Sequence, residues 1–347
     1  MSPYASPPLL DVQSLQVELP VAGVPVRAVD DLSFTVARGE TVCLVGESGS
    51  GKSLTALSLL RLVPPPGRIG RASRIVFDGE DLLGLAPEPL RRIRGQRIAM
   101  VFQEPMTALN PLMTIGDQVA EVLMLKQQLT KAQSAQSAIE MLASTGIPEP
   151  ARRAASYPHQ LSGGQRQRVA PAGALVRRPK RLLLGEPLGA LDKKLRERTQ
   201  FELVNIQEKL GVTFVIVTHD QEEAMTLGTR IGVMHAGEIL QVGTPTDIYE
   251  YPTSRYVADF IGSVNLAAGR IVEDEPDHVR IECPEFGTTM YVDHGVSAPP
   301  TAEVSVAIRP EKIQLTRDAP PQPENVVAGT IKEIAYLGDL SRYLVKL

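Results

Sequence analysis

The chain has 347 residues, of which 43% are hydrophobic and 22% charged, the composition of an ordinary globular protein with a sizeable core. This length predicts two domains, one large and one small. The net charge of −4 gives no reason to expect nucleic-acid binding, and the two distant cysteines, Cys43 and Cys283, argue against a disulfide framework or a metal cluster.

Up to about residue 262, short β-branched segments alternate with longer helical ones. This alternation predicts an α/β fold with a mostly parallel sheet, and it predicts helices over Ser53–Val63 and Leu191–Leu210. The predicted strands, several of them almost continuously apolar, are Thr41–Val45, Arg97–Phe102, Arg181–Leu184, Thr213–Thr218 and Arg230–Met234. No apolar segment approaches the roughly 20 residues that span a bilayer. We therefore expect any membrane role to depend on a partner.

From about Val264 the pattern changes to short alternating segments separated by Pro, Gly and Asp. Examples are His278–Glu282, Thr289–Val292 and Glu303–Ile308, which predict a small β-domain. The chain stops at Leu347 inside a further alternating segment, so we expect this domain to be truncated, lacking its last strand or two. The predicted division is therefore residues 1–262 and 263–347.

The strand Thr41–Val45 leads into a glycine-rich segment that opens the next helix. The segment has the sequence pattern GxxxxGK[ST]. Because it lies between a strand and a helix, this pattern favours a phosphate loop over a Gly/Ser-rich turn. Its backbone N–H groups and the helix N-terminus attract phosphate oxygens, while the lysine reaches the β- and γ-phosphates and the final hydroxyl is a Mg²⁺ ligand. The predicted nucleotide-binding residues are Gly46, Glu47, Ser48, Gly49, Ser50, Gly51, Lys52 and Ser53.

Four further short motifs follow the loop. They are Val101-Phe-Gln-Glu-Pro105, Leu161-Ser-Gly-Gly-Gln165, Leu182-Leu-Leu-Gly-Glu-Pro187 with Ala190-Leu-Asp192 behind it, and Val217-Thr-His-Asp220. In content and order, the five motifs resemble those of the ABC transporter ATPases. The resemblance implies a P-loop NTPase fold with a helical subdomain at about residues 104–165, followed by a β-barrel domain of the TOBE or OB-like type.

The resemblance also implies roles for individual residues. Glu186 matches the general base that polarises the attacking water, and His219 the switch histidine that contacts the γ-phosphate. Gln103 matches the loop glutamine that helps to hold Mg²⁺ and the water. The signature residues Ser162, Gly163, Gly164 and Gln165 begin a helix, which makes them an anion-binding end that closes over the ATP of a second subunit.

Three residues depart from the family pattern. Gly185 replaces an aspartate that helps to hold Mg²⁺ through its water shell, so we expect impaired hydrolysis with ATP binding retained. Pro171 and Gly173 lie in the helix after the signature, where we predict a kink near Ala170, because proline costs a helix interior about 3 kcal/mol. In addition, Val21–Asp31 contains no aromatic residue to stack on adenine.

The two halves resemble different importers. Residues up to about Arg168 are similar to dipeptide, oligopeptide and nickel importer ATPases, for example in Ile98-Ala-Met-Val-Phe-Gln-Glu-Pro105. Residues from about Arg177 are similar to spermidine/putrescine importer ATPases, for example in Gln241-Val-Gly-Thr-Pro245 and Ala307-Ile-Arg-Pro-Glu311. Because the second resemblance includes the whole accessory domain, the polyamine branch is favoured, and the peptide branch stays open as the alternative.

The resemblance implies a peripheral protein at the cytoplasmic face of the inner membrane. Its expected cofactors are ATP and Mg²⁺. Its expected partners are integral-membrane permease subunits, a second ATPase subunit of like or unlike sequence, and indirectly a periplasmic substrate-binding protein. Two other interpretations remain: a regulatory or vestigial subunit that binds ATP but hardly hydrolyses it, and a soluble ABC ATPase of DNA repair or translation. The single cassette and the absence of a heptad pattern disfavour the last of these.

Overall fold

The computed structural model describes most of the chain, in two compact units, Met1–Tyr251 and Pro252–Leu347. The described residues are 7–101, 109–127, 129–163, 165–166, 169, 181–184, 200–201, 203–205, 207–208, 211–296, 299, 301–318, 320–321, 324–336, 338 and 340–347. Among these, no helix has the combined length and hydropathy of a membrane-spanning segment. The predicted boundary between residues 262 and 263 remains a prediction.

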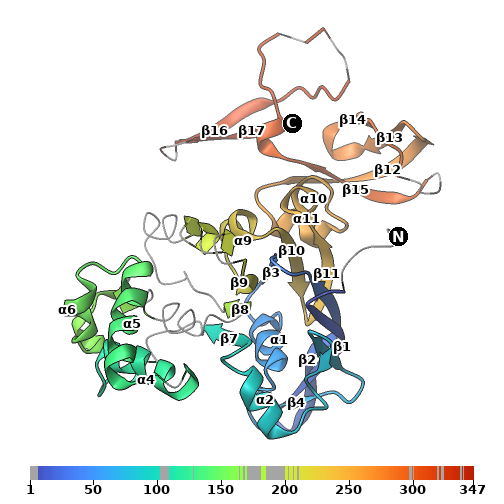
Figure 1. Ribbon diagram of the computed structural model, residues 1–347. Coiled ribbons are helices and arrows are strands. Elements are labelled where there is room, and N and C mark those ends of the chain that lie inside the picture. Colours follow the sequence, from blue (N-terminus) through green and yellow to red (C-terminus); the bar gives the residue numbers. More distant parts are fainter. Residues whose placement is uncertain are drawn as a thin grey trace. The chain divides into compact units, whose positions relative to one another are not determined.

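A six-stranded sheet forms the centre of the first unit (Figure 1). Its order is β11 (Glu238–Gly243), β10 (Arg230–His235), β3 (Thr41–Gly46), β9 (Thr213–Thr218), β8 (Arg181–Leu184) and β7 (Ile98–Val101). All neighbours are parallel except β11, which runs antiparallel to β10. Every residue of β3 and β9 is buried, as expected of central strands covered on both faces. The five predicted strands and the mostly parallel sheet are thus confirmed.

Four helices of the first unit follow or precede these strands. They are α1 (Lys52–Leu59), α2 (Pro87–Ile93), α9 (Gln221–Leu227) and α10 (Pro245–Glu250). The prediction that the first helix reaches Val63 was wrong. The helix ends earlier because Arg61 adopts a left-handed conformation (φ 50°), and the amides of Arg61 and Leu62 turn back to the carbonyls of Ser58 and Leu57. Most of the predicted helix Leu191–Leu210 and the predicted kink at Pro171 lie outside the described residues.

An antiparallel sheet that the sequence analysis did not anticipate packs on α1. Its strands are β2 (Val24–Val36), β1 (Leu10–Val21), β5 (Arg74–Phe77) and β6 (Glu80–Asp81), with β4 (Arg68–Ile69) also paired to β1. The turn between β1 and β2 has two central residues with positive φ, Ala22 (50°) and Gly23 (82°), the geometry of a tight type I′ hairpin.

Three helices form a separate cluster with its own core: α4 (Ile115–Gln127), α5 (Lys131–Ser144) and α6 (Pro150–Ala154), followed by a 3₁₀ turn at Pro158–Gln160. Thr130 caps α5 by accepting a hydrogen bond from the Gln133 amide, and the Gln133 side chain accepts one from the Thr130 amide. Ile115, Ala138 and Leu142 are fully buried in this cluster.

The second unit is mainly β, as predicted. After α11 (Arg255–Phe260) it has a four-stranded antiparallel sheet in the order β14 (Thr288–Val292), β13 (His278–Cys283), β12 (Asn265–Glu275) and β15 (Glu303–Ile308). A separate hairpin joins β16 (Thr330–Tyr336) to β17 (Ser341–Lys346). The buried Arg309 guanidinium donates to the carbonyls of Ala258 and Ser263, which ties α11 to the end of β15.

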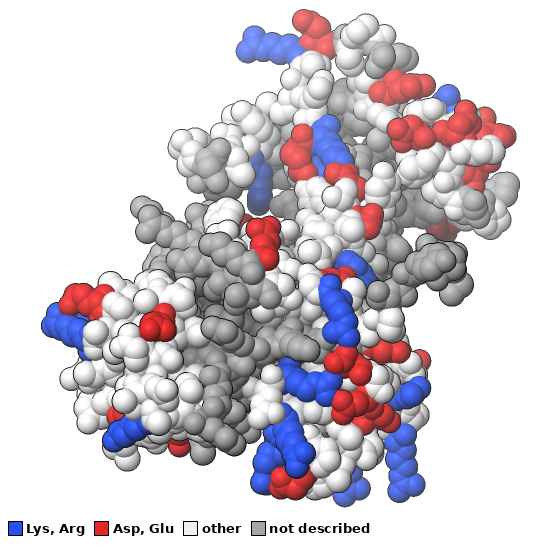
Figure 2. All heavy atoms as spheres, viewed as in Figure 1, with Lys and Arg blue, Asp and Glu red and all other residues white. Residues whose placement is uncertain are grey.

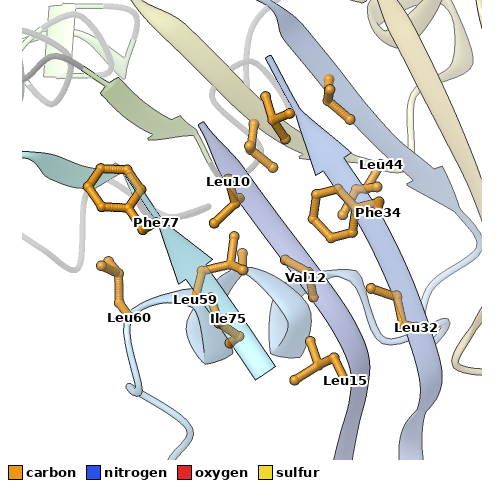
Figure 3. Packing of buried hydrophobic residues seen from close by; sticks show 14 of the residues in the cluster. Leu10, Val12, Leu15, Leu32, Phe34, Leu44, Leu59, Leu60, Ile75 and Phe77 are labelled. Carbon is orange, nitrogen blue, oxygen red and sulfur yellow. The ribbon is translucent and has the colours of Figure 1, made fainter. Parts of the chain in front are cut away.

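The main hydrophobic core lies between α1 and the antiparallel sheet (Figure 3). Leu59 of α1 is 1% exposed and packs among Leu10 of β1 and Ile75 of β5. We expect Leu59→Ala to lower the free energy of unfolding of this unit by about 2–5 kcal/mol, because a buried cavity replaces the isobutyl group. Chemical denaturation followed by circular dichroism measures this loss.

Leu62 provides the matched control for that substitution. It lies three residues further along the chain and is 37% exposed. Leu62→Ala should change the free energy of unfolding by about 0.5 kcal/mol or less. Equal losses in the two variants would mean that this core does not hold α1 in place.

Candidate functional site

The glycine-rich loop lies between the buried strand β3 and helix α1, as predicted. Gly49 (φ 84°) and Gly51 (φ 97°) both adopt left-handed backbone conformations, and the Gly51 carbonyl accepts the first helical hydrogen bond, from the Thr55 amide at 2.9 Å. The first amides of a helix have no acceptor within it. The loop therefore brings unbonded helix N–H groups and turned backbone to one point, which is what a phosphate group requires.

Two of the loop glycines are required by close backbone contacts. A Cβ atom on Gly46 would lie 2.2 Å from the Met234 carbonyl oxygen of β10. A Cβ atom on Gly51 would lie 2.5 Å from the Ala28 carbonyl oxygen of β2. These distances leave no room for a side chain, so both neighbouring strands fix the path of the loop.

We expect Gly51→Ala to distort the loop, since the substitution combines an unfavourable φ with a clash against rigid backbone. Strain of this kind costs about 1–3 kcal/mol, and it should lower both the thermal midpoint and the affinity for ATP. Calorimetric titration with ATP and thermal denaturation measure the two effects.

Gly39→Ala is the control, because Gly39 has a similar φ (74°) but open space where the added methyl group would lie. It should lower the thermal midpoint less and leave the ATP affinity unchanged. If Gly51→Ala bound ATP as well as the unaltered chain, the contact with Ala28 would have no part in shaping the site.

Lys52 is buried, with 6% of its surface exposed, and its ammonium group points back into the loop. The Nζ atom donates to the carbonyl oxygens of Gly46 (2.8 Å) and Glu47 (2.7 Å) and to the Ser50 hydroxyl (3.1 Å). These three acceptors are neutral, and they orient the ammonium group. A buried cation held by backbone carbonyls and a hydroxyl suits the oxygens of a polyphosphate.

His219 lies at the same edge of the sheet as the phosphate loop. It follows β9, whose last residue, Thr218, lies opposite Val45 at the end of β3. Asp220 caps α9 by accepting from the Glu223 amide (3.1 Å), and its own amide donates to the Thr218 hydroxyl (3.0 Å). The exposed His219 side chain is thus carried on a turn fixed on both sides.

Gln103, Gly164, Gly185 and Glu186 lie outside the described residues, so their roles stay predictions. The strands that precede them in the chain, β7 and β8, are described. Leu184, the last residue of β8, lies opposite Ile216 of β9, and Val101 of β7 lies opposite Leu184. The carboxyl ends of these parallel strands therefore meet at one edge of the sheet.

The signature segment belongs to the helical cluster. Leu161 is buried in the core of that cluster, whereas Ser162 and Gly163 are exposed. The Ser162 hydroxyl accepts from the Gln165 amide (3.3 Å), and the Gln165 side chain accepts from the Ser162 amide (3.1 Å), which forms a capping box. The phosphate-loop helix packs in the other core, with Leu59 and Leu60. Signature and loop are therefore built on separate hydrophobic cores.

Backbone support from two hairpins was missed by the sequence analysis. The Gly237 amide, in the turn between β10 and β11, donates to the Ser50 carbonyl (3.2 Å), and the Asp30 amide of β2 donates to the Gly237 carbonyl (2.9 Å). Gly237 has φ 90°, and a Cβ atom there would lie 3.1 Å from the Ala28 oxygen. The Ala-Gly turn is visible in the sequence, but its contact with the loop is long-range and has no local signal.

Comparison with known proteins agrees with this arrangement. The ABC transporter family matches residues 29–189, and the TOBE domain family matches residues 306–347. The putrescine transport ATP-binding protein PotG of Escherichia coli K12 is 48% identical over 322 residues, which cover 92% of this chain and 81% of PotG. The chain belongs to the ABC transporter family. The predicted P-loop NTPase fold, the ATPase class and ATP binding by the cassette are confirmed.

One further relative and one solved structure are also similar to this ABC cassette. The dipeptide transport ATP-binding protein DppD of Bacillus subtilis 168 is 40% identical over 256 residues, covering 74% of this chain and 76% of DppD. A solved dimeric ATP-binding cassette in a post-hydrolysis state, bound to ADP and Pi, has a TM-score of 0.61 and 30% identity, covering 68% of this chain and 98% of its own. Relatives of both predicted branches are thus present.

Proposed function

We propose that this ABC protein is the ATP-hydrolysing subunit of a polyamine importer of the spermidine/putrescine type. The observation that carries the proposal is the extent of the similarity to PotG, which covers 92% of the chain and so reaches beyond the ABC cassette. The similarity to the dipeptide protein DppD covers only 74% of the chain. The accessory unit that distinguishes the branches is therefore part of the match with the polyamine protein.

In the proposed site, the backbone of Gly46–Ser53 surrounds the phosphates and Lys52 reaches the β- and γ-phosphates. The three neutral acceptors described around its Nζ atom support this role, because charged phosphate oxygens are stronger acceptors for an ammonium group. The Ser53 hydroxyl, in the first turn of α1, is a hard oxygen donor suited to Mg²⁺. Mg²⁺, when bound, neutralises charge on the phosphates.

We assign the chemical step to residues that follow the parallel strands. Glu186 orients a water molecule and accepts its proton as the water oxygen attacks the γ-phosphorus, and the bond to the ADP oxygen breaks. His219 stabilises charge on the γ-phosphate oxygens, and Gln103 positions the water and Mg²⁺. The fixed turn around His219 supports this assignment, because a preorganised donor stabilises the transition state without reorganising.

The proposed active form is a dimer of ATPase subunits. The exposed helix end at Ser162, Gly163 and Gln165 suits a phosphate group, with Gly164 completing the signature. Since this end and the phosphate loop are on separate cores, we propose that each signature closes over the ATP of the second subunit. The dimer is bound to integral-membrane permeases at the cytoplasmic face of the plasma membrane, and a periplasmic substrate-binding protein delivers the cargo to the permeases.

A peptide importer is the second candidate, favoured by the 40% identity to DppD. The experiment that separates the two uses the chain co-purified with the permeases encoded beside it and reconstituted in proteoliposomes, with the matching substrate-binding protein added outside. With ATP inside, labelled putrescine should accumulate and a labelled dipeptide should not. Uptake of the dipeptide alone would refute the polyamine assignment. The Gly185→Asp variant is assayed in parallel, because ATP hydrolysis by the unaltered chain can be too slow to drive detectable uptake.

A further inference from the structure

A cavity of about 350 Å³ lies beyond the C-terminal end of α1, on the side of the cassette away from the phosphate loop. It is lined by Arg61, Arg71, Ser73 and Gly70 together with the apolar side chains of Ile69 and Leu83. The eight residues of α1 separate Lys52 from this cavity by about 12 Å along the helix axis. The cavity is therefore no part of the nucleotide site described above.

The polar groups of the cavity still have hydrogen-bonding capacity. The Arg61 side chain is held in place because its Nη1 donates to the carbonyls of Leu85 (2.6 Å) and Leu82 (3.4 Å), which leaves its other N–H groups available. Ser73 is only 9% exposed, and its hydroxyl accepts from the Gln16 amide (2.9 Å), so its own proton remains to be donated. Within the described part of the chain, the Arg71 side chain has no hydrogen bond and no ion pair.

The lining of the cavity includes two arginines, Arg61 and Arg71, and no acidic residue. The sequence from Ser48 to Phe77 contains no acidic residue but four arginines, at positions 61, 68, 71 and 74. Of the acidic residues that follow, Asp78 and Glu80 pair with Arg97. Asp81 lies next to the cavity, because its carboxylate accepts from the amide of the lining residue Leu83 (3.1 Å). Figure 2 shows several Lys and Arg side chains at the lower end of the cassette, where Figure 1 places α2 and β4, with Asp and Glu side chains among them.

The pKa of Arg94 points in the same direction. Its side chain donates to the Leu60 and Arg61 carbonyls, next to the cavity. Burial lowers its pKa first, and the charges of Arg61 and Arg91 lower it further. Cations crowded into one region in this way would be stabilised by a bound anion.

We propose that this cavity, called here the arginine pocket, binds a phosphate group that carries an apolar or glycerol substituent. Guanidinium groups bind phosphate through paired N–H donors, and Arg61, Arg71 and Ser73 supply such donors from two sides. The walls formed by Val63, Ile69 and Leu83 favour an amphiphilic ligand over a bare ion. The phosphate is either that of an anionic lipid headgroup or that of a soluble phosphate ester.

Two assays on the full chain separate these sources, both with excess ADP so that the phosphate loop is filled. One is calorimetric titration with sn-glycerol 3-phosphate. The other is co-sedimentation with phosphatidylcholine vesicles, with and without phosphatidylglycerol. Binding in both assays, or to the anionic vesicles alone, assigns the pocket to lipid, and binding of glycerol phosphate alone assigns it to a soluble ester. Binding in neither assay would overturn the proposal.

Arg71→Gln is the test variant, because Arg71 is exposed and unbonded, so its loss should not affect folding. Arg74→Gln is the matched control: it removes the same charge from an exposed, unbonded residue at the start of β5 that does not line the cavity. We expect Arg71→Gln to weaken binding about fivefold, the equivalent of about 1 kcal/mol, and Arg74→Gln to weaken it clearly less. Equal weakening would mean a diffuse basic surface in place of a pocket. Neither assay measures ATP hydrolysis or transport, so the outcome does not depend on the proposed cargo.

Discussion

Replacing Lys52 by alanine is expected to lower ATP hydrolysis by about 100- to 1,000-fold, the effect of removing one preorganised donor from a charged transition state. The buried ammonium is the one cation that the described structure places inside the glycine-rich loop. Without this ammonium group, neither the bound triphosphate nor the charge that develops in the transition state is stabilised by a buried cation in the loop. Steady-state phosphate release measures the rate, and calorimetric titration measures the affinity for ATP.

Lys131→Ala is the control for this prediction, because it removes the same charge from an exposed position at the start of α5. It should leave both hydrolysis and affinity unchanged. Thermal denaturation of Lys52→Ala checks that the loop still folds, since the carbonyls of Gly46 and Glu47 lose a donor. Unaltered ATP affinity in a folded Lys52→Ala chain would refute the assignment of the nucleotide site.

Restoring a carboxylate at position 185 is expected to raise ATP hydrolysis by about 10- to 100-fold. An outer-sphere ligand typically contributes this much to metal affinity or activity, and Gly185 occupies the position where the family has an aspartate. The gain should be largest at low Mg²⁺ concentration, because the weakened step is metal binding. Hydrolysis measured across a Mg²⁺ titration, with and without Gly185→Asp, tests this expectation.

Two controls sharpen the position 185 experiment. Gly185→Asn has nearly the same size but no charge, so it should recover much less activity than the aspartate. Combining Gly185→Asp with Glu186→Gln should abolish the gain, because the general base is lost. If Gly185→Asp hydrolysed ATP no faster than the unaltered chain at any Mg²⁺ concentration, glycine at 185 would not be the defect.

The antiparallel sheet shows why local pattern can hide a strand. Apolar residues alternate at Leu10 and Val12, but the alternation resumes one residue out of step at Leu15 and Val17. The change of step is a bulge: Ser14 has φ 45°, and the pairing of β1 with β2 shifts between Val12 and Leu15. Because a period-two pattern that slips by one residue no longer reads as a single strand, these twelve residues escaped the sequence analysis.

The central strands, unlike β1, were predicted from the sequence. They are buried on both faces, so they are almost continuously apolar and need no alternation of apolar and polar residues. Thr213–Thr218 is apolar apart from its end residues and was predicted with its observed bounds. The phosphate loop was equally predictable, since its chemistry needs glycines, a lysine and a hydroxyl at fixed spacing within eight residues. His219 was predicted in the same way, as a short motif directly after a strand. The register of β9 against β3 places it at the same edge of the sheet as the phosphate loop.

The sequence by itself determined the fold class and the family, and it predicted the residues of the nucleotide site, because strand burial and phosphate binding both leave short, local patterns. Only the tertiary structure decided that Ala28 and Gly237 shape the loop, that the signature stands on a separate core, and that Arg61, Arg71 and Ser73 line one cavity. Each of these depends on contacts between segments far apart in the chain. Such contacts arise from packing and backbone hydrogen bonding, which almost any residue type can provide, so they leave no pattern in the sequence.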